Sequence, residues 1–134
     1  MADITITVQK MIEIQEGIIN HSTRDEDRNM AGTRDEASLY HIISTLEYDS
    51  EINKDVIKQA AFVLYFISVV HPFKQANKRT AFFTADTILG WSGYFIKIDP
   101  AEGEKFLLEI ARDEHTQKDV EEWIRSHVDK LTPA

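Results

Sequence analysis

The stretch VIKQAAFVLYFISVVHPFKQANKRTAFFTADTILGW, residues 56–91, decides the fold. Apolar residues occupy nearly every side of its first half, which predicts a buried central helix that Asn53 caps and that ends near Val70. Pro72 disfavours helical backbone at the residue before it, so this helix stops before the proline. A second helix is predicted over residues 77–91. A short loop therefore joins two apolar helices in the middle of the chain.

Polar residues outside this stretch are placed to cap further helices, and most of them have an acidic residue three positions later. The predicted helices start at Thr7, at Thr33 (with Glu36, to about Tyr48), at Asp99 (with Pro100 and Glu102) and at Thr116 (with Asp119, to about Lys130). The short aromatic and β-branched segment 94–98 is predicted to pair with residues 4–7. The chain 1–134 is therefore predicted to be a single all-α domain of about six helices.

The composition narrows the classes of function. The chain has 134 residues, no cysteine and a formal net charge of −8, with 43% hydrophobic and 28% charged residues. The missing cysteines exclude disulfides, thiolate catalysis and Cys-ligated zinc. No apolar run reaches the roughly 18 residues that cross a bilayer, and the N-terminus carries no secretion signal, so we expect a cytoplasmic protein with no membrane partner. The acidic balance also argues against nucleic acid as a partner.

The loop between the two central helices, HPFKQANKRT at residues 71–80, carries the candidate chemistry. A loop that feeds a helix N-terminus presents unpaired backbone N–H groups and partial positive charge, which suit an anion. Lys78 and Arg79 lie in the first turn and face the positive end of the helix dipole, so a bound anion would explain their position. The imidazole of His71 suits proton transfer at neutral pH, and Phe73 is predicted to anchor the loop in the core.

This loop resembles the signature of the Fic/Doc family, which runs His-x-Phe-x-acidic-small-Asn-(Gly or Lys)-Arg. Six positions match it in type and spacing: His71, Phe73, Ala76, Asn77, Lys78 and Arg79. Lysine before the arginine, with Thr80-Ala81 after it, is similar to the death-on-curing (Doc) toxins. The resemblance implies a helical bundle in which the motif joins two central helices, and it covers nearly the whole chain.

The resemblance also implies roles for the motif residues. His71 would be the base that takes a proton from a target hydroxyl as the hydroxyl attacks a phosphate. The phosphates of ATP or another nucleoside triphosphate would be held by Lys74, Ala76, Asn77, Lys78 and Arg79. Doc-like members transfer a phosphate to a protein hydroxyl, whereas the glycine form of the motif goes with AMP transfer (AMPylation).

Gln75 departs from the signature. The family's acidic residue at this position binds Mg²⁺, which prefers anionic oxygen ligands, and a neutral amide lacks that charge. Besides phosphate transfer, the sequence therefore leaves open AMP transfer and a catalytically silent module that binds a nucleotide or a partner protein.

Two protein partners follow from the resemblance. The polar loop 21–33 corresponds to the target-docking flap of the family, so the target hydroxyl is expected to dock there. The Ser/Thr-x₃-Glu-(Gly or Asn) mark of the family's inhibitory helix does not occur, because Ile12 and Ile98 stand four residues before the two Glu-Gly pairs. A toxin-like member without that helix implies a separate antitoxin protein.

Arg34 and His41 support a rival prediction. Their Arg-x₆-His spacing resembles the active site of HEPN ribonucleases, and about two helical turns would separate the two side chains on one helix face. The acidic neighbours Asp35 and Glu36 would, however, repel RNA.

Overall fold

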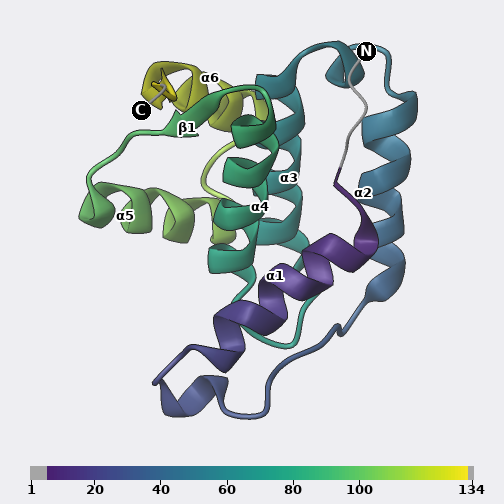
Figure 1. The fold of residues 1–134 in the computed structure, drawn as a ribbon, viewed down its shortest axis with the longest axis vertical. Helices are drawn as coiled ribbons and strands as arrows, with labels where there is room; N and C mark the ends of the chain where they lie inside the picture. Colours follow the sequence, from purple (N-terminus) through teal and green to yellow (C-terminus); the bar gives the residue numbers. More distant parts are fainter. Residues whose placement is uncertain (1–5, 133–134) are drawn as a thin grey trace.

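The structure, a computed structural model, describes residues 6–132 and is mostly helical (Figure 1). Its helices are α1 (Val8–Asn20), η1 (Asp25–Asp27), α2 (Glu36–Tyr48), η2 (Ile52–Lys54), α3 (Val56–Val70), α4 (Asn77–Trp91), α5 (Pro100–Ala111) and α6 (Gln117–His127), where η marks a short 3₁₀ helix. Two short strands, β1 (Tyr94–Ile96) and β2 (Val128–Lys130), complete the fold. The predicted all-α class is therefore confirmed. No helix in this part of the chain is long and apolar enough to span a membrane.

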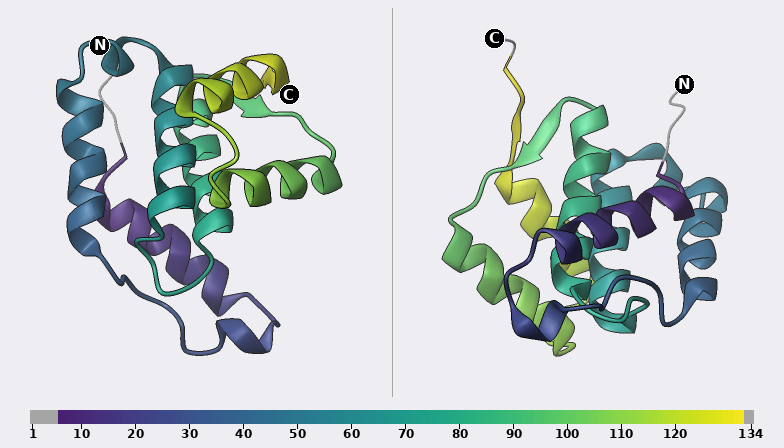
Figure 2. Two further views of the ribbon diagram at one scale, coloured as in Figure 1. Left: turned by 180° about the vertical axis from the view of Figure 1, so that it is seen from behind. Right: turned by 60° about the horizontal axis from the view of Figure 1, so that its bottom comes forward.

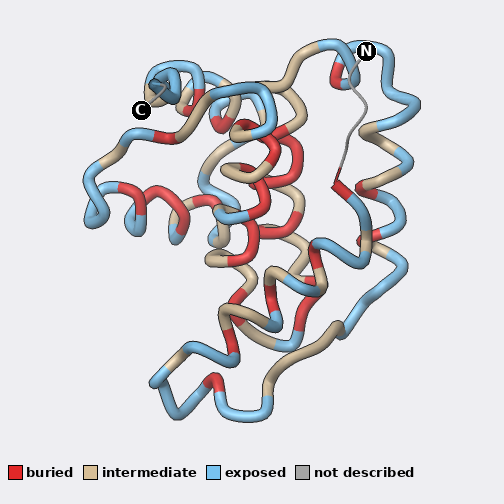
Figure 3. The backbone as a smooth tube through the Cα atoms, viewed as in Figure 1, coloured by how far each residue is buried: buried red, intermediate tan, exposed pale blue. Residues whose placement is uncertain are grey.

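The helices α3 and α4 form an antiparallel pair at the centre of the molecule (Figures 1 and 2). On one side α1 packs across α4 and α2 packs beside α3, while α5 and α6 cover the other side. Buried residues concentrate along the facing sides of α3 and α4 (Figure 3), where Leu64, Ile67, Ala81 and Leu89 have no exposed surface. The loop between these two helices therefore starts and ends on well-buried helices.

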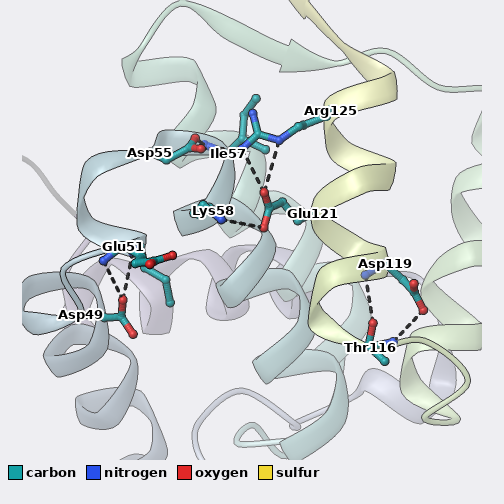
Figure 4. Close-up of polar contacts among 10 residues, drawn as sticks. Asp49, Glu51, Asp55, Ile57, Lys58, Thr116, Asp119, Glu121 and Arg125 are labelled. Carbon is teal, nitrogen blue, oxygen red and sulfur yellow. Dashed lines mark hydrogen bonds and ion pairs between the residues drawn. The ribbon is translucent and has the colours of Figure 1, made fainter.

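Local capping signals place several helices correctly. Thr7 Oγ1 accepts a hydrogen bond from Lys10 N at 3.0 Å and starts α1. Asp99 starts α5 by accepting from the backbone of Ala101 and Glu102. Thr116 and Asp119 exchange backbone-to-side-chain bonds of 3.1 and 2.9 Å at the start of α6 (Figure 4). These predictions are confirmed because each cap depends only on neighbours in sequence.

Two predicted caps are wrong. Asp35 rather than Thr33 caps α2, because the backbone of Thr33 forms a bridge to Phe73 in the loop between α3 and α4. Asp55 rather than Asn53 caps α3, because Asn53 lies in η2 and donates its side-chain amide to Glu47 O at 3.0 Å.

The predicted strand pairing is also corrected. Strand β1 pairs antiparallel with β2, with Ile96 opposite Val128, rather than with Ile6 and Thr7, the described part of the predicted partner 4–7. Residues 4 and 5 lie outside the described residues, Ile6 is buried, and Thr7 is the cap of α1. Because β2 takes residues 128–130, α6 ends at His127 and not near Lys130.

Candidate functional site

The loop from His71 to Ala76 begins and ends in an unusual backbone conformation. His71 ends α3 with φ 59°, and Ala76 precedes α4 with φ 65°, so both residues are in the left-handed region that favours glycine. Non-glycine residues in this region cost about 1–2 kcal/mol each and cluster at functional sites. Ala76 makes no side-chain capping bond, so the first-turn N–H groups of α4 are left for another acceptor.

Asn77 and Phe73 hold the loop in shape. The Asn77 amide accepts from Phe73 N at 2.9 Å and donates to Phe73 O at 3.0 Å, while the Phe73 ring is fully buried. Phe73 therefore occupies an anchoring position beneath the loop. The side chain of Asn77 is engaged with the loop backbone, and its contact with phosphate oxygens stays a prediction.

The end of the polar segment 21–33 runs along this loop. Lys74 N donates to Gly32 O at 3.1 Å, and the backbone of Arg34 and Asp35 donates to Pro72 O at 2.7 and 2.9 Å. Gly32 has φ 118°, which side-chain-bearing residues rarely adopt, so glycine is needed for this approach. The predicted docking loop is thus joined to the motif through backbone hydrogen bonds.

Gln15 of α1 is a buried residue that the sequence analysis missed. Its side chain donates to Met30 O at 3.0 Å and Gln75 O at 3.1 Å and accepts from Gly32 N at 2.9 Å. It therefore ties the docking loop to the motif loop. One signal was available, because Gln15 interrupts a buried stripe between Met11 and Ile19.

Asp27 of η1 is the second missed residue. Its carboxylate has no exposed surface and binds Arg79 through two bonds, Nη1–Oδ2 at 2.8 Å and Nη2–Oδ1 at 2.9 Å. Ser22 also donates to Oδ2. The hydrogen bonds from Arg79 hold the pKa of Asp27 far below its usual range, although burial alone would raise it. Asp27 stands in a run of five charged residues, 24–28, so nothing in the sequence distinguished it.

A cavity of about 680 Å³ opens beside the loop. Its polar wall contains His71, Gln75, Ala76, Asn77, Lys78 and Arg79. Its apolar wall contains Phe82, Ile96, Ile98, Leu107 and Leu108. The structure thus brings together every predicted site residue except Phe73, which lies in the core, and Lys74, which is exposed and does not line this cavity.

His71 lines this cavity. No residue among 6–132 makes a hydrogen bond to the His71 imidazole, whereas its backbone O accepts from Arg34 Nη2 at 2.8 Å. The ring nitrogens therefore remain available to a ligand in the cavity.

The arrangement predicted for a HEPN ribonuclease is wrong. Arg34 precedes α2 instead of lying within it, and its guanidinium binds the backbone of His71. His41 packs against Phe66 with ring centroids 5.2 Å apart. The two side chains are thus engaged separately rather than sharing one helix face.

The residues around position 75 do not fit a Mg²⁺ site. Gln75 offers a neutral amide, and the nearby carboxylate of Asp27 is buried and already satisfied by Arg79 and Ser22. Glu26 and Glu104 line the cavity, but residues 6–132 contain no group of three or more acidic or histidine side chains placed to hold a metal ion.

A histidine and a cationic helix start line one cavity of this helical protein, which is a layout compatible with transfer chemistry. The family profile described as "Fic/DOC family" matches residues 5–89, which is more than half of the chain. The chain therefore belongs to the Fic/DOC family, whose function is of the transferase type. No curated protein matches the sequence.

Proposed function

We propose that this protein is a Doc-like transferase that moves a phosphate from a nucleoside triphosphate such as ATP to a hydroxyl of a target protein. The cavity beside the His71–Ala76 loop carries the proposal, because it joins a free imidazole to an anion-binding helix start. Its volume of about 680 Å³ lies within the range of small-molecule sites, and its two walls differ in chemistry.

The polar wall suits the phosphates. The first-turn N–H groups of α4 have no side-chain cap, and Lys78 and Arg79 add donors at the same helix end. Backbone N–H groups and cations at a helix start stabilise negative charge that develops during phosphoryl transfer.

The apolar wall suits the base and sugar. Phe82 of α4, Ile96 of β1 and Leu107 of α5 come from three elements and face the same cavity. A nucleoside packed there would leave its phosphates near the start of α4. The phosphate end of the nucleotide, and not the base, would then face His71.

His71 would act as the general base. Its ring takes the proton of the target hydroxyl while the hydroxyl oxygen bonds to the γ-phosphorus. The bond between the γ-phosphorus and the bridging oxygen breaks, the products are a phosphorylated protein and ADP, and the imidazolium later releases the proton to water.

The target would approach along the loop 21–33. The end of this loop is bonded to the motif through Gly32 and Lys74, so a target segment placed beside it would carry its hydroxyl towards the cavity. A separate antitoxin protein remains a proposal that follows from the resemblance to Doc, and a cytoplasmic location remains a proposal that follows from the composition of the chain.

Two other functions are possible for the same cavity, and the labelling experiment distinguishes them. The same cavity could present the α-phosphate to the hydroxyl, which would give AMP transfer with diphosphate as the leaving group. The neutral Gln75 favours a third candidate, a module that binds nucleotide or partner without transfer, because it removes the family's metal ligand.

The test is incubation of the purified protein and a cell lysate with ATP labelled at either the α- or the γ-phosphate, for wild type and His71→Ala. We expect protein labelling from the γ-label alone and a loss of at least about 100-fold in the variant, the usual scale of general-base catalysis. Labelling from the α-label would show AMP transfer instead. No labelling from either, with ATP still bound, would identify the silent module. Arg125→Ala on α6 is the control, because Arg125 does not line the cavity and its loss should leave labelling unchanged.

A further inference from the structure

Asp27 is a buried carboxylate that the proposed reaction does not use. We propose that Asp27 is a positioning residue that holds Arg79 from behind the cavity and keeps position 75 neutral, so that this site binds nucleotide phosphates without a Mg²⁺ ligand from the protein. The inference rests on the proposed function, because it concerns the same cavity.

The two members of the Asp27–Arg79 pair differ in their access to the cavity. Arg79 lines the cavity and keeps 27% of its side chain exposed, whereas Asp27 has no exposed surface and lines no part of the cavity wall. A guanidinium has five N–H donors, and Asp27 accepts one from each of Nη1 and Nη2. The remaining donors are available to a ligand, so the carboxylate orients Arg79 and does not take the place of a phosphate.

Hydrogen bonds from two residues hold the carboxylate of the pair. The two bonds from Arg79 to the carboxylate fix the plane of the guanidinium, and Ser22 also donates to Oδ2 of the same carboxylate. A bidentate bond to a desolvated partner restricts Arg79 far more than an exposed salt bridge would. Asp27 therefore presents one geometry of Arg79 to the nucleotide.

Gln75 is a neutral residue near this pair. Its backbone O is held by Gln15 at 3.1 Å, and its side chain lies near enough to the Asp27 carboxylate to lower the pKa of that group. A glutamate at position 75 would bring a second negative charge beside a carboxylate that water does not reach. Such like charges repel strongly at low dielectric, whereas a neutral amide does not.

The consequence is a site that depends on protein charges. Lys78 and the N-terminus of α4 supply the positive potential, and Arg79 supplies oriented donors. The affinity for nucleotide should then be nearly independent of Mg²⁺.

The first measurement is calorimetric titration of the wild-type protein with ADP, once with Mg²⁺ and once with EDTA. We expect the two dissociation constants to agree within about threefold. Binding that is at least about tenfold tighter with Mg²⁺ would overturn the proposal.

The second measurement uses matched variants in the same 3₁₀ helix. Asp27→Asn should weaken ADP binding by at least about tenfold, while Asp25→Asn, an exposed neighbour, should not change it. Unchanged or tighter binding in Asp27→Asn would contradict a positioning role. The double variant Asp27→Asn, Gln75→Glu moves the carboxylate from position 27 to position 75 and should recover part of the lost affinity for ADP. A purely structural role of Asp27 would give no such recovery.

The third measurement separates this inference from the proposed function. Gln75→Glu should lower the melting temperature of the wild type by several degrees, and by clearly less in the Asp27→Asn background. If the wild type binds no ADP, the proposed function fails while this coupling between Asp27 and Gln75 is still measured. Melting-temperature losses that simply add would overturn the coupling itself.

Discussion

Two ion-pair clusters tie distant parts of this chain together, and they differ in how much water reaches them. At the motif, Asp27 and Arg79 form a bidentate pair whose carboxylate is fully buried. At the far end of α3, Asp55 and Glu121 share Arg125, with Lys58 also on Glu121, and every member keeps exposed surface (Figure 4). The exposed cluster can rearrange at little cost, whereas the buried pair allows one geometry. The rigid pair lies beside the candidate site, which is where orientation matters.

The largest expected effect comes from breaking the buried pair. Asp27→Asn should lower the free energy of unfolding by about 2–3 kcal/mol, because it leaves the Arg79 guanidinium against an uncharged partner. Arg125→Ala should cost less than about 1 kcal/mol, because its partners regain water. Urea unfolding of both variants measures the difference. Equal losses would mean that burial does not distinguish the two clusters.

Acid should weaken both ion-pair clusters. The pKa of Asp27 is lowered mainly by the hydrogen bonds from Arg79, and that of Asp55 is lowered because bonds from Arg125 and Ile57 outweigh its burial. A carboxyl with a lowered pKa stabilises the fold above its unfolded pKa of about 3.9 and loses that stabilisation as the pH falls through its folded value. The stability gap between wild type and Asp27→Asn should therefore be constant from neutral pH to about pH 5 and shrink below about pH 4. A gap that widens in acid would contradict this assignment.

Salt should have the smallest effect on stability, and this effect should differ between the two ion-pair clusters. Raising the ionic strength to about 1 M shortens the screening length to about 3 Å, which weakens exposed pairs. The destabilisation by Arg125→Ala should fall towards zero, while that of Asp27→Asn should change by less than about 0.5 kcal/mol. Parallel urea titrations at low and high salt test this, and equal salt sensitivity would show that water reaches Asp27.

The sequence predicted the features that depend on near neighbours. The caps at Thr7, Asp99 and Thr116 bond to residues two or three positions away, and Pro72 ends α3 through its own ring. These contacts hold in any fold that contains the helices, so pattern alone was sufficient.

The sequence did not predict the contacts between distant segments. Arg79 finds Asp27 across 52 residues, and Gln15 finds Gln75 across 60. The same limit explains the wrong cap at Thr33, whose backbone is taken by the motif loop, and the wrong end of α6, whose next residues pair with β1. The motif located the candidate site, but not the residues that support it from behind.

The most direct test of the central claim is an NMR titration of ¹⁵N-labelled protein with a non-hydrolysable ATP analogue. If the loop before α4 is the phosphate site, amide signals of residues 73–79 shift as the ligand is added, while those of α6 around Arg125 stay in place. Shifts confined to α6, or no shifts at any ligand concentration, would contradict the assignment of this loop as the nucleotide site.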